Sequence, residues 1–181
     1  MAGGEEVISK RGIPATEVME DVGEFLRKEG DISVEEGVKR IEESYRKYKF
    51  VEQQMVAQIE RVSASLPDLK ESLKILDQLE EQKKNEKPFE MLYLLSDQLF
   101  TKVRVDNPEK VHLWLGANVM VEYSLSEARA IIEKNLRQAE NVIEEITKEL
   151  DFVKDQITTT EVNIAHVYNY GVQQKRLESA K

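Results

Sequence analysis

The residue types that most often carry catalysis or bind metals are few in this sequence and lie far apart. Its 181 residues include no cysteine, which excludes thiolate nucleophiles, thiolate metal sites and disulfides. The two histidines, His112 and His166, stand alone, with no second histidine at helical spacing to complete a metal site. A structural or solvent-facing role explains both histidines better than metal binding does.

Paired carboxylates and glycine-rich loops do not form a site either. The acidic pairs Glu35-Glu36, Glu80-Glu81 and Glu144-Glu145 fall at outward positions of expected helices, where a solvated surface explains them better than acid–base catalysis. Gly3-Gly4 and Gly116 belong to no phosphate-binding motif. We therefore expect a protein that is not an enzyme and that has no catalytic residue, cofactor or metal.

Charge and composition favour long, solvated helices. Charged residues make up 34% of the chain, the formal net charge is −9, and there are only 8 glycines and 4 prolines. Such an acidic chain lacks the basic face that nucleic-acid binding requires, and no apolar run approaches the roughly 20 residues that span a bilayer. The N-terminus lacks the apolar segment of a secretory signal. We expect a protein of the cytoplasm, and also of the nucleus, that binds neither nucleic acid nor membrane.

A seven-residue repeat runs through residues 34–85. Its two apolar rows are Val34, Ile41, Tyr48, Met55, Val62, Leu69 and Leu76, and, four residues later, Val38, Tyr45, Ile59, Leu66 and Leu73. A heptad sustained this long predicts a left-handed coiled coil. Pro67 interrupts the repeat at an outward position and predicts a kink in the helix; the alternative is a true break, with Ser65 capping a second helix.

Residues 125–178 carry a matching repeat. Its rows are Ile132, Ala139, Ile146, Val153, Thr160 and Val167, and Leu136, Ile143, Leu150, Ile157 and Ile164. Each repeat segment has about 50 residues, or about 75 Å of helix at 1.5 Å per residue. Two segments of similar length on either side of a shorter insert predict an antiparallel helical hairpin. We expect the second helix to begin near Ser126.

Between the helices, at residues 86–124, the period changes to that of strands. Residues 99–105, 111–115 and 119–123 are read as strands, and Gly116-Ala117-Asn118 as a hairpin turn. Residues 89–95 are read as a fourth strand, with a helix as the alternative. The predicted fold class is α+β: a long antiparallel coiled-coil hairpin of two helices with two small β-hairpins between them.

Residues 1–33 differ from the rest. Glycine and proline punctuate them at Gly12, Pro14, Gly23 and Gly30. They predict a mostly flexible N-terminal arm that carries one short amphipathic docking helix.

Two small β-hairpins cannot bury both faces of their sheets, so their apolar residues predict a subunit interface. The residues of this predicted interface are Leu99, Phe100, Val103, Val105, Val111, Leu113, Trp114, Leu115, Val119 and Val121. The alternative is that the hairpins pack only on the bases of the chain's own helices.

At the far end of the helical hairpin, apolar residues exceed what one helix seam can bury, and an exposed apolar patch predicts a binding surface. These tip residues are Val34, Val38, Ile41, Tyr45, Tyr48, Phe50, Val51, Ile164, Val167, Tyr168, Tyr170, Val172 and Leu177. The alternative is a tip that is merely thickened and held together by its aromatic side chains.

Four stretches of the sequence resemble the α-class subunits of eukaryotic prefoldin. They read RGIPATEVMEDVGEFL at residues 11–26, YRKYKFVE at 45–52, LWLGANVMVEY at 113–123 and DFVKDQITTTEVNIAHVYNY at 151–170. The resemblance covers nearly the whole chain after residue 10, and the last two stretches are the most specific.

The resemblance implies a subunit of an ATP-independent co-chaperone, a heterohexamer of two α-class and four β-class subunits. In this family the small sheets, here within residues 89–123, join into a β-barrel platform. The tips of the coiled coils, here near residues 34–52 and 160–177, would hold unfolded actin and tubulin and pass them to the cytosolic chaperonin. Several weak tips would hold a client by avidity and release it without hydrolysis.

Two other functions remain open on the sequence alone. The first is a structural coiled-coil tether or adaptor without chaperone activity. The second, a nucleic-acid-binding arm, has only Arg46, Lys47 and Lys49 in its support, and neighbouring acidic residues dilute that charge.

Overall fold

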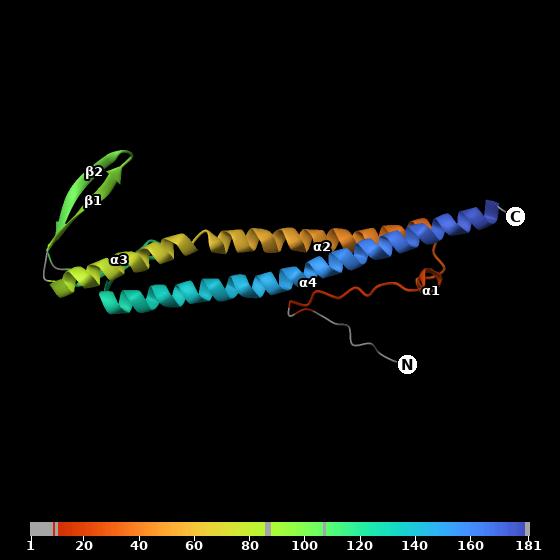
Figure 1. The fold of residues 1–181 in the computed structure, drawn as a ribbon, viewed down its shortest axis with the longest axis horizontal. Helices are drawn as coiled ribbons and strands as arrows, with labels where there is room; N and C mark the ends of the chain where they lie inside the picture. The colour runs from red at the N-terminus through yellow and green to blue at the C-terminus, as the bar shows by residue number, and fades with distance from the viewer. Residues whose placement is uncertain (1–8, 10, 86–87, 107, 180–181) are drawn as a thin grey trace. The chain divides into compact units, whose positions relative to one another are not determined.

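The computed structural model describes residues 9, 11–85, 88–106 and 108–179. In chain order its elements are α1 (Val22–Lys28), α2 (Val34–Ser63), α3 (Leu66–Asn85), β1 (Phe89–Ser96), β2 (Leu99–Val105), β3 (Lys110–Gly116), β4 (Val119–Ser124) and α4 (Leu125–Ser179). Figure 1 labels the four helices and the β1–β2 hairpin. The predicted order of helix, two β-hairpins and helix is confirmed. The chain divides into an arm unit, Met1–Arg61 with Ile143–Lys181, and a hairpin unit, Val62–Val142.

In the arm unit, α2 packs against the later part of α4. One cluster joins Tyr48 and Met55 of α2 to Ile146 and Val153 of α4. A second cluster joins Ile41 to Val167. Because the residue numbers rise on one helix as they fall on the other, the two helices run antiparallel. None of the helices in the described part of the chain is long and apolar enough to cross a membrane.

In the hairpin unit, α3 packs against the beginning of α4. Leu76 is buried there with Leu125, Ala128 and Ile132, and apolar side chains of α3, β3 and β4 surround them. Leu76 and Ile132 lie on the predicted heptad rows, Leu125 precedes Ile132 by seven residues, and the small Ala128 lies beside the row. The apolar repeat therefore positions the helices in both units, as expected of a coiled-coil seam.

The predicted kink at Pro67 is wrong, because the helix is broken there. Ala64 and Ser65 form a turn between α2 and α3, and Pro67 lies in the first turn of α3, where its missing N–H costs no helical hydrogen bond. The Ser65 carbonyl accepts from the Leu69 N–H at 3.2 Å. Its hydroxyl donates back to the Val62 carbonyl at 2.8 Å. Ser65 thus begins the second helix with its backbone, while its side chain closes the end of the first.

The four strands form two separate antiparallel sheets, β1 with β2 and β3 with β4. Residues 89–95 are therefore strand and not helix. In the β3–β4 turn, Ala117 and Asn118 have φ angles of +47° and +62°. Two consecutive positive φ values belong to the tight turns that match the twist of a hairpin. Asn107, between β2 and β3, lies outside the described residues.

The predicted N-terminal arm is docked on the arm unit where the structure describes it. Residues 11–21 are mostly without regular structure, α1 follows, and both lie along α2 and α4 (Figure 1). Over residues 11–33 the arm packs on α2 and α4 and contains the expected docking helix; its flexibility stays a prediction. The first eight residues and residue 10 lie outside the described part of the chain.

Candidate interaction surfaces

The β1–β2 hairpin exposes apolar side chains on both of its faces. Leu92 and Leu94 share one face with Phe100, which pairs with Leu94 across the ladder. Met91, Tyr93 and Val103 share the other face. All six are exposed. Since side chains alternate between the faces of a strand, neither face of this sheet is covered by the described part of the chain.

The β3–β4 hairpin is covered on one face. Val111, Leu113 and Tyr123 pack on the cluster that α3 and α4 form beneath them. The cross-strand pair Trp114 and Met120 lies on the opposite face and is 59% and 57% exposed. This hairpin therefore has a face bound to its own helices and a face with an open aromatic pair.

The structure separates the predicted interface residues into three groups. Val111 and Leu113 pack on the bases of the helices, as the alternative reading expected of the whole set. Val105 and Val121 are half-buried, and the exposed members are Leu99, Phe100, Val103, Trp114, Leu115 and Val119. No described strand pairs outside its own hairpin, so the strand edges as well as the exposed side chains are open to another chain.

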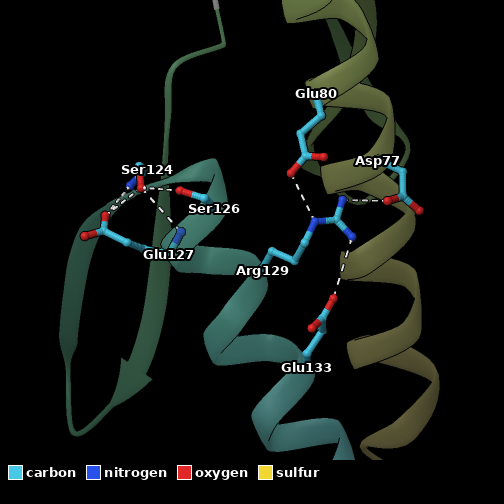
Figure 2. Close-up of polar contacts among 7 residues, drawn as sticks. All are labelled: Asp77, Glu80, Ser124, Ser126, Glu127, Arg129 and Glu133. Atoms are coloured by element: carbon cyan, nitrogen blue, oxygen red, sulfur yellow. Dashed lines mark hydrogen bonds and ion pairs between the residues drawn. The ribbon is translucent and has the colours of Figure 1, made fainter.

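A capping box fixes the junction of β4 and α4 (Figure 2). The Glu127 N–H donates to the Ser124 hydroxyl oxygen at 3.3 Å. In return, the Glu127 carboxylate accepts from the Ser124 N–H at 3.0 Å and from its hydroxyl at 2.7 Å. These bonds to the charged form lower the pKa of Glu127. The helix therefore begins at Leu125, directly after the cap Ser124 and one residue before the expected start near Ser126; the Ser-x-x-Glu spacing is the signal that identifies it.

An arginine joins α3 to α4 in the same unit. Arg129 of α4 points toward α3, where its Nε donates to Glu80 at 3.0 Å and its Nη2 to Asp77 at 2.6 Å (Figure 2). Glu133, one turn further along α4, lies 3.9 Å from Nη1. The hydrogen bonds to Glu80 and Asp77 raise the pKa of Arg129, which therefore stays charged. Glu80, which interrupts the apolar row of α3, thereby has a specific partner on α4.

In the arm unit, side chains of α4 bind the backbone of the arm. The Gln156 Oε1 accepts from the Thr16 N–H at 2.6 Å. Asn163 accepts from the Met19 N–H at 2.7 Å and donates to the Glu17 carbonyl at 2.8 Å. The arm is thus held along α4 by hydrogen bonds to its main chain.

Two further side chains complete this contact. The Tyr48 hydroxyl of α2 donates to the Pro14 carbonyl at 2.9 Å. On α4, the Nδ1 of His166 lies 3.0 Å from the Met19 carbonyl, a geometry in which the ring N–H donates. The histidine that offered no metal partner in the sequence therefore helps to hold the arm.

The helix α1 packs where the extended part of the arm ends. Val22 and Leu26 are buried against Ile41 and Val167. A Cβ atom at Gly37 would lie only 2.7 Å from a Leu26 methyl group, so glycine at this position of α2 permits the close approach. Glycine in a helix interior costs about 1 kcal/mol relative to alanine, which the packing of α1 offsets.

The arm and the helix seam together cover many of the predicted tip residues. Ile41, Tyr48 and Val167 are buried. The half-buried members are Val34, Val38, Tyr45, Val51, Ile164, Tyr170 and Val172. Only Phe50, Tyr168 and Leu177 are largely exposed, at 62%, 65% and 68%.

An open groove remains between the start of α2 and the end of α4. Its volume is about 750 Å³, and its lining includes the tip residues Val34, Val38, Tyr168 and Val172. Lys175 and Glu35 lie 3.4 Å apart at its edge. An apolar floor with a charged rim suits a short apolar segment of another polypeptide.

Sequence reasoning missed the arm-binding residues of α4. Glu149, Gln156 and Asn163 repeat every seven residues directly beside the apolar seam, and all three are buried. In a two-helix coiled coil this row would face solvent. Neutral amides recurring at that spacing are the signal that could have indicated a third segment packed on the coil.

Comparison with known proteins places this geometry in a family. The family model described as prefoldin subunit matches residues 48–170. A Caenorhabditis elegans protein named probable prefoldin subunit 3 is 47% identical over 93% of this chain and 91% of its own. Human prefoldin subunit 3 is 39% identical, and the match covers 93% of this chain and 86% of the human protein. The Saccharomyces cerevisiae protein of that name is 37% identical, and the match covers 92% of this chain and 87% of the yeast protein.

One solved structure has the same fold. A chain of the filamentous prefoldin of Methanocaldococcus jannaschii, determined by cryo-EM, superposes with a TM-score of 0.51. The sequences are 21% identical, and the match covers 62% of this chain and 91% of that chain.

Proposed function

Since the chain belongs to the prefoldin family, among the relatives named prefoldin subunit 3, we propose that it is the α-class subunit of a heterohexamer that holds unfolded proteins without ATP. The family is one of co-chaperones and not of enzymes. The proposed complex contains two α-class and four β-class subunits and acts in the cytoplasm and the nucleus. Its proposed clients are unfolded actin and tubulin, which it passes to the cytosolic chaperonin.

The exposed β-hairpins support the assembly. The β1–β2 hairpin has apolar side chains on both faces, and an isolated two-stranded sheet is at best marginally stable in water. Edge pairing with neighbouring subunits would satisfy the open backbone groups and bury residues such as Phe100 and Trp114. In the proposed hexamer these hairpins form the platform.

The observation that carries client binding is the groove at the end of the arm unit. It offers an apolar floor beside the exposed Tyr168 and is wide enough for several side chains of an unfolded chain. A single open groove of this kind binds weakly, and several of them in one complex bind by avidity. Weak individual contacts also allow a client to leave without an energy source.

The test is suppression of aggregation by the assembled complex. The chain is co-expressed with its partner subunits, either unchanged or with Val38→Glu and Tyr168→Glu together, and chemically denatured actin is diluted into each complex. Native mass spectrometry first establishes that both complexes contain six subunits.

We expect the variant complex to assemble but to lose most of its suppression of actin aggregation. A matched control replaces the exposed Lys134 and Gln138 of α4, in the hairpin unit, with glutamate. Equal suppression by all three complexes would contradict the groove as the holding surface, and a chain that neither assembles nor suppresses aggregation would favour a tether.

A further inference from the structure

The extended part of the arm is held mainly through its backbone, beside two side-chain contacts: the Thr16 hydroxyl lies 2.8 Å from the Tyr48 hydroxyl, and Met19 packs on the cluster of Ile41 and Val167. Five main-chain groups between residues 14 and 19 are bonded: the carbonyls of Pro14, Glu17 and Met19, and the N–H groups of Thr16 and Met19. Every residue has a carbonyl, and every residue except proline has an N–H. A surface that binds these groups would therefore accept an extended segment of almost any sequence.

The spacing of the helix side chains matches that of an extended chain. Gln156 and Asn163 are seven residues apart on α4, about 10 Å along a helix at 1.5 Å per residue. Their partners Thr16 and Met19 are three residues apart, and an extended chain also covers about 10 Å in that distance. Each heptad of α4 can therefore bind one three-residue step of a segment that runs in the same direction.

The row continues one heptad beyond its hydrogen bonds to the arm, where Ile13 of the arm packs on the cluster of Ile146 and Val153. Glu149 precedes Gln156 by seven residues and is only 9% exposed, and its Oε2 has no hydrogen-bond partner within the part of the chain that the structure describes. A buried, unpartnered carboxylate oxygen is costly unless a donor reaches it. A bound segment that continues in the N-terminal direction could supply a backbone N–H at this position.

An apolar pocket follows the row at its other end. Val22 and Leu26 of α1 occupy it against Ile41 and Val167. The complete surface thus binds a stretch of bare backbone followed by apolar side chains. Unfolded polypeptides expose these two chemistries together, whereas folded proteins conceal both.

We propose that residues 14–26 are a tethered stand-in for a client, and that an extended apolar segment of an unfolded protein displaces them from the row of Glu149, Gln156 and Asn163. This inference rests on the proposed holdase function. It adds to the open groove a second client surface, whose access the arm regulates. A short tether gives the arm an effective concentration in the millimolar range. The arm therefore competes with every bound segment and returns when the segment leaves, which favours release without ATP.

A cross-link that keeps the arm in place tests the exchange. Because the chain has no cysteine, Met19→Cys with His166→Cys introduces two unique thiols at neighbouring positions, which a short bismaleimide can join. Binding of fluorescent reduced, carboxymethylated α-lactalbumin, a permanently unfolded protein, is measured by anisotropy with the assembled complex. The matched control carries the same cross-linker between Glu144→Cys and Lys148→Cys, within one exposed turn of α4.

We expect the arm cross-link to weaken binding of the unfolded probe about tenfold, because it removes the state in which the arm has left α4 and the row can bind the probe. The control cross-link should leave binding of the probe unchanged. Equal binding with and without the arm cross-link would overturn the exchange and leave the holdase function standing. Absence of probe binding by the unmodified complex would overturn the holdase function, and this inference with it.

A second pair of variants tests the backbone-binding row itself. In a complex whose chain lacks residues 1–33, and whose assembly native mass spectrometry verifies, we expect probe binding to be severalfold tighter than in the full-length complex. Gln156→Leu with Asn163→Leu in that background should weaken it about tenfold, since two buried hydrogen-bonding groups are lost. Asn169→Leu, at an exposed position of the same helix, is the control. Unchanged binding in the Gln156/Asn163 variant would contradict the row as a client surface.

Discussion

The side-chain amide of Asn163 accepts a hydrogen bond from the backbone N–H of Met19 at 2.7 Å, across 144 residues of sequence. The same amide donates to the Glu17 carbonyl at 2.8 Å. One side chain therefore satisfies both a donor and an acceptor of the arm. This two-sided contact joins the start of the chain to its last helix and makes the arm part of the arm unit.

Replacing Asn163 should release the arm while leaving the coiled coil intact. In Asn163→Ala, the Met19 N–H and the Glu17 carbonyl lose their partner, which costs about 1–3 kcal/mol for partly buried groups. We expect the amide of Met19 to exchange its hydrogen at least tenfold faster, as measured by NMR or mass spectrometry. Asn169→Ala is the control on an exposed position of α4. Unchanged protection of Met19 would contradict the docking.

A charge on the open face of the β3–β4 hairpin should prevent assembly without unfolding the chain. Trp114 is 59% exposed, so Trp114→Lys should change the stability of the isolated chain by no more than about 0.5 kcal/mol. Burial of the new lysine between subunits would be unfavourable, and we expect the hexamer to disappear in native mass spectrometry. Gln138→Lys, at an exposed position of α4, is the control. Normal assembly of Trp114→Lys would exclude this face from the interface.

The capping box of α4 gives a pH-dependent prediction. The hydrogen bonds from Ser124 lower the pKa of Glu127, so its stabilising contribution is present above the ordinary glutamate pKa and is lost as the pH falls through the lowered value. The urea midpoint of Glu127→Gln should therefore lie below that of the unchanged chain at pH 7, and the two midpoints should converge as the pH falls through the lowered pKa of Glu127.

The serine of the box can be tested at constant pH. Ser124→Ala should lower the free energy of unfolding by about 1 kcal/mol, the usual cost of losing an N-cap side chain. Ser126→Ala, two residues later, should have a much smaller effect. Equal effects of the two substitutions would contradict the assignment of Ser124 as the cap.

The Arg129 contacts should contribute modestly to the packing of α3 on α4. Arg129 is partly buried and bonds two carboxylates of α3, so Arg129→Gln should cost about 1 kcal/mol, at the upper end for an ion pair near solvent. Arg137→Gln is the matched control, because Arg137 is 71% exposed and its ion pair with Glu133 lies within α4. Chemical unfolding of both variants gives the comparison. A larger loss of unfolding free energy for Arg137→Gln than for Arg129→Gln would contradict a contribution of Arg129 to this packing.

The helices and strands could be predicted because their apolar periods are strong and local. The heptad rows of residues 34–85 and 125–178 become the seams of α2, α3 and α4, and the alternating residues 99–105 become β2. The helix break before Pro67 was harder to predict, because a proline in the first turn of a new helix and a proline inside a kinked helix have the same neighbours in sequence. The choice between them depends on two turn residues, Ala64 and Ser65.

The docked arm could not be predicted in the same way. Its hydrogen bonds to α4 join residues 140 or more positions apart, and they involve backbone groups, which carry no sequence signal. Ile41, Tyr48 and Val167 were expected at an exposed tip because the third segment that covers them was not recognised. The glycines at positions 37 and 171 indicate close packing at the helices, but only once the neighbouring Leu26 and Val34 are known.

The most direct test of the central claim is a photo-cross-link from the open groove to an unfolded client. The photoreactive residue p-benzoylphenylalanine replaces the exposed Tyr168 in the assembled complex, and in a second preparation it replaces the exposed Lys134 of the hairpin unit. Denatured actin is added and the complexes are illuminated. We predict a cross-linked product with actin from position 168 and little or none from position 134. Equal yields from the two positions, or none from position 168, would contradict a client-holding surface at the end of the arm unit.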